Sequence, residues 1–512
     1  MAYATEQHTV FGQQVTVQPR DLKDEGWHVQ TLGGSWHVWQ YSTLLDRTDL
    51  PLWPNDMLEA RVVLASHQCR PNIPLPPAPF MFPGGLEHCG MHISATAAHG
   101  NAAPVRGHMR RWLARFMGSG ASDSKPVPLP ESFVDLGAAS IYYFSPFTSR
   151  ELATAQSESR LDLARVALGN NHPLCAIIAP QVVQQKSNRW LDNHRVEITI
   201  RRTSEGFVRI NAQVLSLLYP AGDISIRPLA NTTSSITVVG PTKQQKPFML
   251  RARDQTPTPL AVPEEFYAAA SKTSAQLVGT LDVRTSDFAS FHPSLQIATH
   301  QTNALPATEE GCRLEVIVAL PKTYFFDPYQ LQERLSLHHE HHGPVELERP
   351  AEVMDNWGSL LVLSQKPPPT DLFNVTVPIH SRYRLPPIPS EATVGYHGEP
   401  IGDSHVDLAL LPPIAAIVCP IDSHRSDTVD GSLLGGLEMR PALFGELGLR
   451  PIGLLEPAVD IETLLRMPVG YTENPMLIQA LTLAALFAGT IFICMSVKAG
   501  TANPCQPAKN NK

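Results

Sequence analysis

The sequence predicts a mainly β protein: an antiparallel β-sandwich-like domain, an α+β N-terminal region and one C-terminal transmembrane helix. Three observations lead to this fold class. The 512 residues include 47 prolines, about twice the ordinary share, and only 17% charged residues, which suits short strands and loops better than a helical bundle. Alternation of apolar and polar residues recurs along the chain. One uncharged stretch near the C-terminus is long enough to cross a bilayer.

The charge balance and the cysteines argue against two kinds of site. A net charge of −8 without a long basic run leaves no electrostatic footprint for nucleic acid, so no nucleic-acid partner is predicted. The seven cysteines form no CxxC pair and no Cys/His spacing typical of zinc. We therefore predict neither a bound metal nor another cofactor, and the cysteine count alone neither demands nor excludes disulfides.

The N-terminal region, residues 1–190, is predicted to contain two helices. The segment Arg150–Gly169 has a helical pattern that ends at its glycine. The segment Met109–Met117 places apolar side chains on one helical face and arginines elsewhere. Such a basic amphipathic helix lies either on a membrane surface or against its own domain. A linker rich in glycine, serine and proline follows at residues 117–130.

Alternating patterns predict strands over residues 191–425, which we assign to one lumenal β domain. Within residues 194–201, Val196, Ile198 and Ile200 share one face and polar residues share the other. Turn-rich segments separate such patterns, as in an antiparallel β-sandwich. Three further strands are predicted at residues 313–321, 406–410 and 414–419.

A loop-rich stem, residues 426–475, is predicted to lead to the membrane segment. Residues 476–497 are uncharged, and a helix of this length spans about 33 Å, enough for a hydrocarbon core of roughly 30 Å. The alternative is a buried core helix, which normally carries a wider polar stripe. We predict a single transmembrane helix.

The flanking charges predict the orientation of this helix. Lys498, Lys509 and Lys512 lie in the tail, residues 498–512, without an acidic residue, whereas Glu473 lies on the other side. The positive-inside rule then places the tail in the cytosol and the N-terminal region in the lumen. The first twenty residues show no apolar region typical of a signal peptide, which leaves the route of translocation open.

Two glycosylation sequons and the C-terminal sequence bear on the location. Asn231 and Asn374 each begin an Asn-x-Thr pattern, which gives mild support for a lumenal domain. The C-terminal KNNK has a lysine at the fourth position from the end, as in part of a dilysine retrieval signal. Together these features favour the endoplasmic reticulum membrane.

The segment Asn374–Tyr383 is predicted to form a strand that presents a recognition row. Pro378 cannot donate a ladder hydrogen bond, which favours an edge strand or a bulge. Strand alternation predicts Val375, Val377, Ile379 and Tyr383 on one face, and Asn374, Thr376, Pro378, His380 and Arg382 on the solvent-facing other face.

The end of this strand resembles a known family. His380–Pro387, with the sequence HSRYRLPP, is similar to the hallmark of the PIG-X family of endoplasmic reticulum membrane proteins, called PBN (protease B non-derepressible) in fungi. Three further blocks are similar in the same order: Cys312–Leu331 with CRLEVIVALPKTYFFDPYQL, Asn356–Ser359 with NWGS, and Leu411–Pro420 with LPPIAAIVCP. A C-terminal membrane helix follows them, as in the family, whereas residues 1–190 add little to the resemblance.

The resemblance implies a non-catalytic protein. PIG-X-like proteins associate with and stabilise the multispan PIG-M-type catalytic subunit of GPI mannosyltransferase I, which adds the first mannose to the GPI anchor precursor. The catalytic acids belong to that partner, so no catalytic residue is expected here. Fungal members likewise reach the lumen without an obvious signal peptide. The family positions of Cys312 and Cys419 imply a lumenal disulfide, which the compartment permits.

The resemblance also directs attention to His380, Arg382, Tyr383 and Pro386 as a docking or structural motif. In one interpretation the first three form an exposed docking row. In the other, Tyr383 lies in the core and Arg382 pairs with a carboxylate. The residues alone leave both interpretations open.

Two other groups of residues contain the residue types of a zinc site or a catalytic triad, but their spacing in the sequence does not match either motif. The run His338–His342 lacks the His-Glu-x-x-His pattern of a zinc protease and is predicted to be a solvated loop. Asp403, Ser404 and His405 are adjacent, so they cannot readily act as orienter, nucleophile and base. An unrecognised lumenal hydrolase and a general lumenal chaperone for membrane proteins remain the alternative functions.

Overall fold

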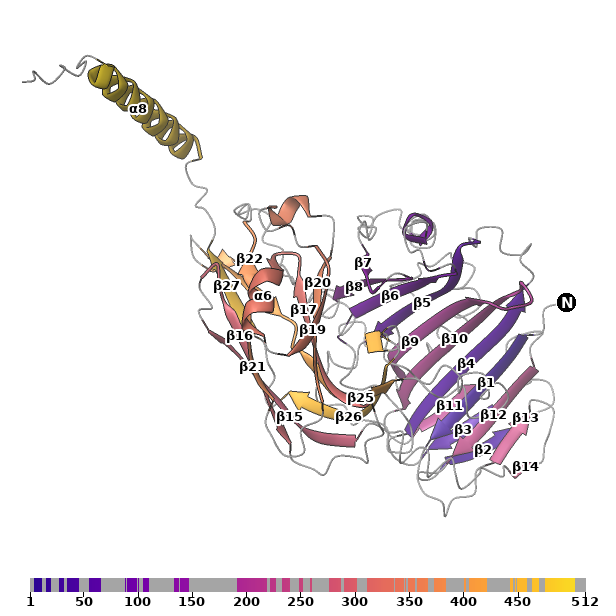
Figure 1. Ribbon diagram of the computed structural model, residues 1–512. Helices are drawn as coiled ribbons and strands as arrows, with labels where there is room; N and C mark the ends of the chain where they lie inside the picture. The colour runs from indigo at the N-terminus through magenta and orange to yellow at the C-terminus, as the bar shows by residue number, and fades with distance from the viewer. Residues whose placement is uncertain are drawn as a thin grey trace, which may run out of the picture.

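A computed structural model shows two β domains and a separate C-terminal helix, α8 (Pro475–Thr501) (Figure 1). The mainly β fold class is confirmed. The structure describes residues 4–11, 15–19, 27–31, 35–45, 55–65, 88, 90–98, 100, 105–109, 133–137, 139–146, 191–218, 222–226, 233–239, 248–251, 258–259, 276–286, 290–301, 311–335, 337–344, 346, 349–354, 357–366, 373–383, 400–401, 405–420, 443–444, 447, 449–457, 463–468 and 475–501.

The first domain is built on an eleven-stranded sheet in which only β1 and β12 are parallel neighbours. Its strands, in spatial order, are β14 (Thr258–Pro259), β13 (Phe248–Arg251), β12 (Thr233–Val239), β1 (Ala4–Phe11), β4 (Ser35–Leu45), β10 (Val208–Leu218), β9 (Leu191–Arg202), β5 (Met57–Ala65), β6 (Gly90–Ala97), β8 (Ser140–Pro146) and β7 (Val134–Asp135). A small sheet of β11 (Gly222–Ile226), β3 (Trp27–Thr31) and β2 (Val15–Pro19) accompanies it.

The alternation in β9 has the sidedness that its sequence predicts. Val196, Ile198 and Ile200 are buried on one face. On the other face Glu197 accepts hydrogen bonds from Arg61 at 2.7 Å and from Arg195 at 2.5 Å. Burial alone would raise the pKa of the Glu197 carboxyl, but the two guanidinium groups hold that pKa below its usual value.

This first sheet crosses the boundary that the sequence places at residue 190. Strands β1 and β4 pair with β12 and β10, so segments on both sides of residue 190 share one core. Sheet pairing joins segments that are far apart in sequence, and composition along the chain carries no signal of it. The change of domain in the structure falls between β14 and β15 (Gln276–Ser286).

The second domain is built on an eight-stranded sheet. Its strands, in spatial order, are β19 (His338–His342), β20 (Gly358–Gln365), β17 (Arg313–Pro321), β25 (Ile414–Pro420), β26 (Leu449–Pro457), β15, β16 (Ser294–Gln301) and β21 (Asn374–Pro378). Two smaller ladders join β18 (Tyr324–Phe325) to β22 (His380–Ser381), and β23 (Pro400–Ile401) to β24 (His405–Leu410) and β27 (Thr463–Pro468). The helix α6 (Pro328–Arg334) and the 3-10 turn η4 (Ala351–Val353) complete it.

This sheet is curled, so that its two halves enclose one core. The central strand β17 is buried along nearly its whole length on both faces. On the inner face Leu314, Val316, Val318 and Leu320, which the sequence places together, join Leu295, Ile297 and Val377 from the opposite half. We call this cluster the inner core.

The outer face of β17 packs against the first domain. Ile317 and Ala319 lie in one apolar cluster with Tyr142 and Phe144 of β8. The indole of Trp357 contacts both aromatic rings edge-on, with ring centroids 6.1 and 5.8 Å apart. Figure 1 shows the β7 and β8 edge of the first sheet beside β20 and β17. The two domains therefore share an apolar interface.

The segment expected to be a loop-rich stem contains β26 and β27, and β26 is an interior strand of the second sheet. Its prolines and glycines suggested loops. Pro451, however, lies at a register irregularity opposite Val418, where a ladder hydrogen bond is not required. A Cβ atom at Gly453 would lie 3.1 Å from Val278, so the glycine permits close packing of β26 on β15.

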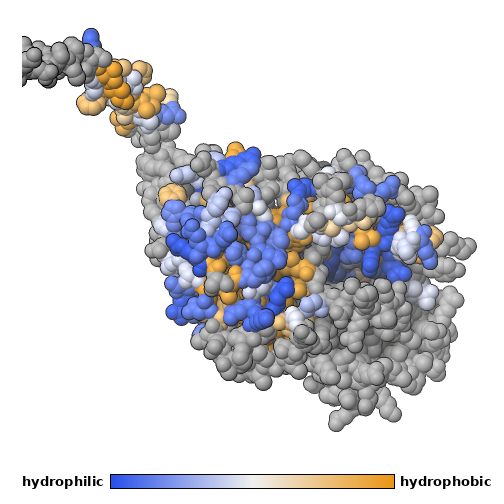
Figure 2. Space-filling model, viewed as in Figure 1, coloured by the Kyte–Doolittle hydropathy of each residue, from blue (hydrophilic) through white to orange (hydrophobic). Residues whose placement is uncertain are grey.

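The helix α8 contains the predicted membrane segment. Residues Gln479–Lys498 are long and apolar enough to cross a membrane, with a mean hydropathy of 2.2 and none of that window buried inside the protein. Figure 2 shows this helix as a largely apolar rod that extends from the two domains. Because its apolar side chains lie outside the core, a core helix does not explain them.

The predicted N-terminal helices fall mostly outside the described residues. Arg150–Gly169 lies wholly outside them, as does the linker at residues 117–130. Residues 105–109 form one helical turn, in which Val105 and Met109 are buried.

A disulfide joins Cys312 to Cys419, the pair that the family resemblance implies. The two cysteines lie in the inner core, at the end of the β17–β25 ladder where β17 begins. They close a loop of 107 residues in sequence separation. A cross-link over so long a loop restricts the unfolded chain strongly.

We expect Cys419→Ala to lower the free energy of unfolding by roughly 2–5 kcal/mol, because the loop becomes free in the unfolded chain. The measurement is thermal unfolding of the detergent-solubilised full chain, with mobility on non-reducing gels as the test for the bond. The control is Cys494→Ala, because Cys494 is an exposed free cysteine in α8. Equal transition temperatures for both variants would contradict the expectation.

Candidate functional site

The strand β21 forms one edge of the second sheet, as Pro378 predicts. It pairs on one side only, with β16, in the register Ser294↔Pro378. Val375 and Val377 are buried and Asn374 and Thr376 are exposed, so the alternation holds up to Val377. Pro378 is buried rather than solvent-facing as predicted, because the strand ends there. The sequon side chain of Asn374 therefore stands on the open edge of the domain.

The chain after β21 ties together three parts of the domain. Ile379 and Ser381 donate from their backbone N–H groups to the carbonyls of Pro293 and Phe291, at 3.0 and 2.9 Å. Through the β18–β22 ladder the same segment pairs with the chain that follows β17. The Tyr383 carbonyl accepts from the Ala351 N–H at 3.0 Å, which holds η4. We call Ile379–Tyr383 the closure segment.

Arg382 is the central side chain of the closure segment. It is 2% exposed, although it carries a guanidinium group. Its Nη1 atom donates to the carbonyl oxygens of Glu346 and Arg349, the latter at 3.1 Å, and its backbone N–H donates to the Thr323 carbonyl at 2.8 Å. The guanidinium carbon lies 4.4 Å from the centroid of the Phe325 ring, a cation–π geometry. Burial lowers the pKa of Arg382 from its ordinary value.

His380 of the closure segment packs between the rings of His292 and Phe325. Its Nδ1 atom shares a hydrogen bond with Nδ1 of His292 at 2.7 Å, and its ring stacks on Phe325 at a centroid distance of 5.3 Å. Burial first, and then the neighbouring His292, lower the pKa of His380, although Asp327 acts in the opposite direction. The neutral imidazole is therefore favoured in the folded protein.

The structure contradicts the predicted recognition row at Arg382 and Tyr383. Arg382 is buried rather than solvent-facing, and Tyr383 is 69% exposed rather than on the core face. The physical reason is that the ladder of β21 ends at Pro378, after which the chain pairs with β18, so the alternation does not continue. The second interpretation is also corrected, since Tyr383 lies outside the core and Arg382 binds backbone carbonyls.

Pro386 and Asn231, the remaining residues of the predicted sites, lie outside the described residues. Asp403 and Ser404 also lie outside them, while His405 begins β24.

The histidine-rich run His338–His342 forms the edge strand β19, not the predicted loop. It pairs with β20, a buried strand whose free side requires a hydrogen-bonding partner, and this backbone requirement outweighs the polar side chains. Gly343 ends it at φ 132°, where a Cβ atom would lie 2.7 Å from the Ser359 Cβ. Only glycine fits this turn.

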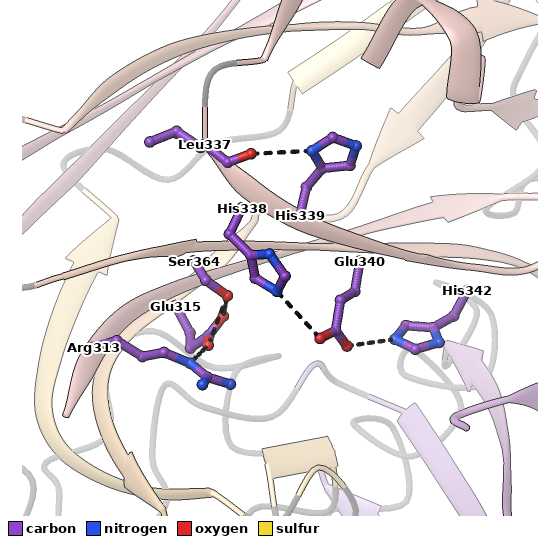
Figure 3. A network of polar contacts seen from close by, with 8 residues as sticks. All are labelled: Arg313, Glu315, Leu337, His338, His339, Glu340, His342 and Ser364. Carbon is purple, nitrogen blue, oxygen red and sulfur yellow. Dashed lines mark hydrogen bonds and ion pairs between the residues drawn. The ribbon is translucent and has the colours of Figure 1, made fainter. Parts of the chain in front are cut away.

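The side chains of β19 form a network of polar contacts (Figure 3). Glu340 lies between His338 and His342, with carboxylate–imidazole distances of 3.5 and 3.8 Å. His342 also donates from Nδ1 to the Asp135 carbonyl oxygen at 3.1 Å, which links β19 to the first domain. Within the described part of the chain, no group of three or more potential ligands is arranged to hold a metal.

Glu315 in β17 is a buried polar residue that the sequence analysis missed. It is 0% exposed and accepts from the Ser364 hydroxyl at 2.9 and 2.8 Å and from Arg313 (Figure 3). Burial raises the pKa of its carboxyl, against the opposing effect of Arg313 and Ser364. The available signal was one acid inside an otherwise apolar strand. Its partners satisfy it structurally, which does not make it an acid–base catalyst.

A cleft of about 360 Å³ lies beside the open edge of β21. Arg334 and Leu335 of the α6 end and Gln365 of β20 face Asn374 and Thr376 across it. This is the gap that remains where the two halves of the curled sheet approach each other. The polar groups that line the cleft are the side-chain amides of Gln365 and Asn374, the hydroxyl of Thr376 and the guanidinium group of Arg334. These lining residues include no pair of a nucleophile and a general base.

Residues 289–428 match the family described as PIG-X / PBN1. This part of the chain is therefore similar to the PIG-X / PBN1 family. The match begins five residues before β16 and includes both cysteines of the disulfide and the closure segment. The family resemblance of the sequence blocks is confirmed.

Three curated relatives, each named Protein PBN1 or pbn1, are similar over part of this domain. The protein of Gibberella zeae is 35% identical over 105 residues, that of Neurospora crassa 33% over 105, and that of Debaryomyces hansenii 30% over 97. Each similarity covers 19% of this chain and 21%, 21% and 20% of the respective relative. The chain thus spans about a fifth of the length of the curated relatives it matches.

The family match falls within the second domain and includes six of the eight strands of the curled sheet, since β15 and β26 lie outside it. The first domain, including β7 and β8 at the domain interface, lies outside the match, as does α8. The closure segment, with Arg382 at its centre, lies within the matched residues.

We expect Arg382→Met to lower the free energy of unfolding by roughly 2–5 kcal/mol, because the carbonyls of Glu346 and Arg349 lose their donor and Phe325 loses its cation. The control is Arg349→Met. That side chain is 44% exposed in an ion pair with Glu346, so its loss should cost less than about 1 kcal/mol. Thermal unfolding of both variants checks this, and comparable losses would contradict the central role of Arg382.

We expect the protein to lose stability as the pH falls below about 6.5. Burial lowers the pKa of His88 to about 3 and that of His341 to about 4, and the pKa of His380 is also lowered. In the unfolded chain histidines bind protons with a pKa near 6.5, whereas in the folded protein these three stay neutral at that pH. Each proton that only the unfolded chain binds lowers the free energy of unfolding by up to about 1.4 kcal/mol per pH unit. His341→Gln should reduce the loss between pH 7 and pH 5.

The measurement is the thermal unfolding temperature of the full chain in detergent across that pH range. The control is His338→Gln on the same strand, since its side chain is 69% exposed. Stability that is independent of pH, or an equal effect of the two substitutions, would contradict the assignment to His341.

Proposed function

We propose that the chain is a non-catalytic accessory subunit in GPI-anchor biosynthesis, which stabilises the PIG-M-type catalytic subunit of GPI mannosyltransferase I. The observation that carries the proposal is the match of residues 289–428 to the PIG-X / PBN1 family, in one chain with a candidate membrane span. The proposed location is the endoplasmic reticulum membrane, with both β domains in the lumen and the short tail in the cytosol.

The construction of the domain supports a stabilising role. A curled sheet that is closed by a disulfide and by the closure segment is a rigid body, suited to holding a surface in one shape. The helix α8 would hold that body beside a multispan enzyme in the same bilayer. Binding to the folded form of the enzyme would stabilise it by mass action, and loss of the subunit would expose the enzyme to degradation.

The position of Arg382 changes how the predicted motif would act. Because Arg382 is buried and His380 is half-buried, they would support the docking domain rather than contact the partner directly. Their substitution would weaken association by destabilising the domain. A docking contact by Arg382 itself would require the closure segment to open.

We expect depletion of the chain to reduce the abundance of the catalytic subunit several-fold, and the wild-type chain to restore it. Replacement of His380, Arg382 and Tyr383 together should fail to restore it, whereas Arg349→Met should succeed. The measurement is quantitative detection of the catalytic subunit and its co-purification with the detergent-solubilised chain, with endoglycosidase H treatment to test lumenal glycans. Unchanged abundance together with absence of the enzyme from the purified material would contradict the proposal. Recovery of many unrelated membrane proteins instead would favour the general chaperone.

A further inference from the structure

Exposed apolar side chains gather at one end of the second domain. Outside α8, the large hydrophobic side chains that are exposed in the described part of the chain are Phe207, Phe291, Tyr329, Val353 and Tyr383. Phe291 and Tyr383 are in contact, with ring centroids 5.7 Å apart. The Ala351 N–H donates to the Tyr383 carbonyl, and Val353 lies two residues further along η4. We call Phe291, Val353 and Tyr383 the end patch.

The scaffold holds the end patch in place. The Phe291 carbonyl accepts from the Ser381 N–H at 2.9 Å, and Tyr383 directly follows the buried Arg382. The three side chains are nevertheless 37%, 50% and 69% exposed. Ordered apolar groups that cluster in water commonly mark a surface that is covered by something else.

The end patch lies at the end of the domain from which the chain leads to the membrane segment. Figure 1 places β22 and β27 at the same end of the domain, on the side where α8 lies. Only six residues separate Pro468, the last residue of β27, from Pro475, the first of α8. An extended chain of this length reaches about 25 Å. When α8 crosses a bilayer, this end of the domain must therefore lie close to the bilayer surface.

We propose that the end patch rests in the interfacial layer of the bilayer that α8 crosses. Tyrosine and phenylalanine suit this layer, since a ring can enter the apolar boundary while the tyrosine hydroxyl stays hydrated. The contact would supplement α8 and fix the tilt of the two β domains on the membrane. It rests on the candidate span and does not depend on the proposed accessory function.

The charges around the end patch indicate which lipids it accepts. Glu346 and Arg349 form an ion pair, and Glu352 is exposed beside Val353. These described neighbours provide no excess of positive charge to attract anionic headgroups. The patch therefore contacts zwitterionic lipid through apolar insertion, and the contact is insensitive to salt.

The test uses the purified full chain in vesicles of phosphatidylcholine, with the photo-reactive residue p-benzoylphenylalanine in place of Phe291 or Tyr383. The matched control is the same replacement at Phe207, which is 36% exposed. Phe207 precedes Val208 of β10, which pairs with β4 in the first domain. Figure 1 shows β10 and β4 on the side of the molecule away from α8. After irradiation, mass spectrometry should find phospholipid adducts at positions 291 and 383 several-fold above position 207, at low and at high salt.

Adduct levels at positions 291 and 383 equal to those at position 207 would overturn the proposal. So would protein adducts at these positions in native membranes without lipid adducts, because they would assign the patch to a protein partner. Each variant is used only when its thermal transition and its Cys312–Cys419 disulfide match those of the wild type. A second variant pair, Phe291→Ser with Tyr383→Ser, should abolish the cross-linking of a photo-reactive residue placed at Val353.

Discussion

One buried guanidinium group holds the second domain in its curled form. The two halves of the eight-stranded sheet share an inner core, but β17 and β21 are not neighbours in that sheet. Arg382 connects them, because it follows β22 in the chain and binds the carbonyls that precede β20 while covering Phe325. A buried cation is costly, and the bonds from Nη1 of Arg382 to these two carbonyls offset part of that cost, so the segments that supply the carbonyls must stay in place. The geometry of this end of the domain follows from that requirement.

The strand β17 is fixed at both of its ends. At its beginning the disulfide between Cys312 and Cys419 joins it to β25, and at its end the closure segment pairs with β18. Between these points the strand is buried on both faces, one against the inner core and the other against the first domain. A strand with no solvent-facing side cannot move without loss of packing on two sides. It provides a rigid support for both the end patch and the interface between domains.

The interface between the domains combines aromatic packing with a polar contact. Tyr142 and Phe144 of the first domain contact Trp357 of the second domain, and His342 donates to the Asp135 carbonyl. The first domain thus covers the outer face of a sheet that would otherwise expose Ile317 and its neighbours. This gives the N-terminal part of the chain a structural role that its own sequence does not suggest.

The sequence by itself determined the strands with clear alternation, such as β9 and β17, the edge position of β21 through Pro378, and the apolar helix α8. These features depend on local periodicity and on the chemistry of single residues, which a sequence carries directly. The cysteine pair followed from the family resemblance. Only the tertiary structure decided that Arg382 is buried, that Tyr383 is exposed, that His338–His342 forms a strand and that one sheet crosses residue 190. Each of these depends on which distant segment supplies hydrogen bonds or covers an apolar face, and local patterns do not encode that choice.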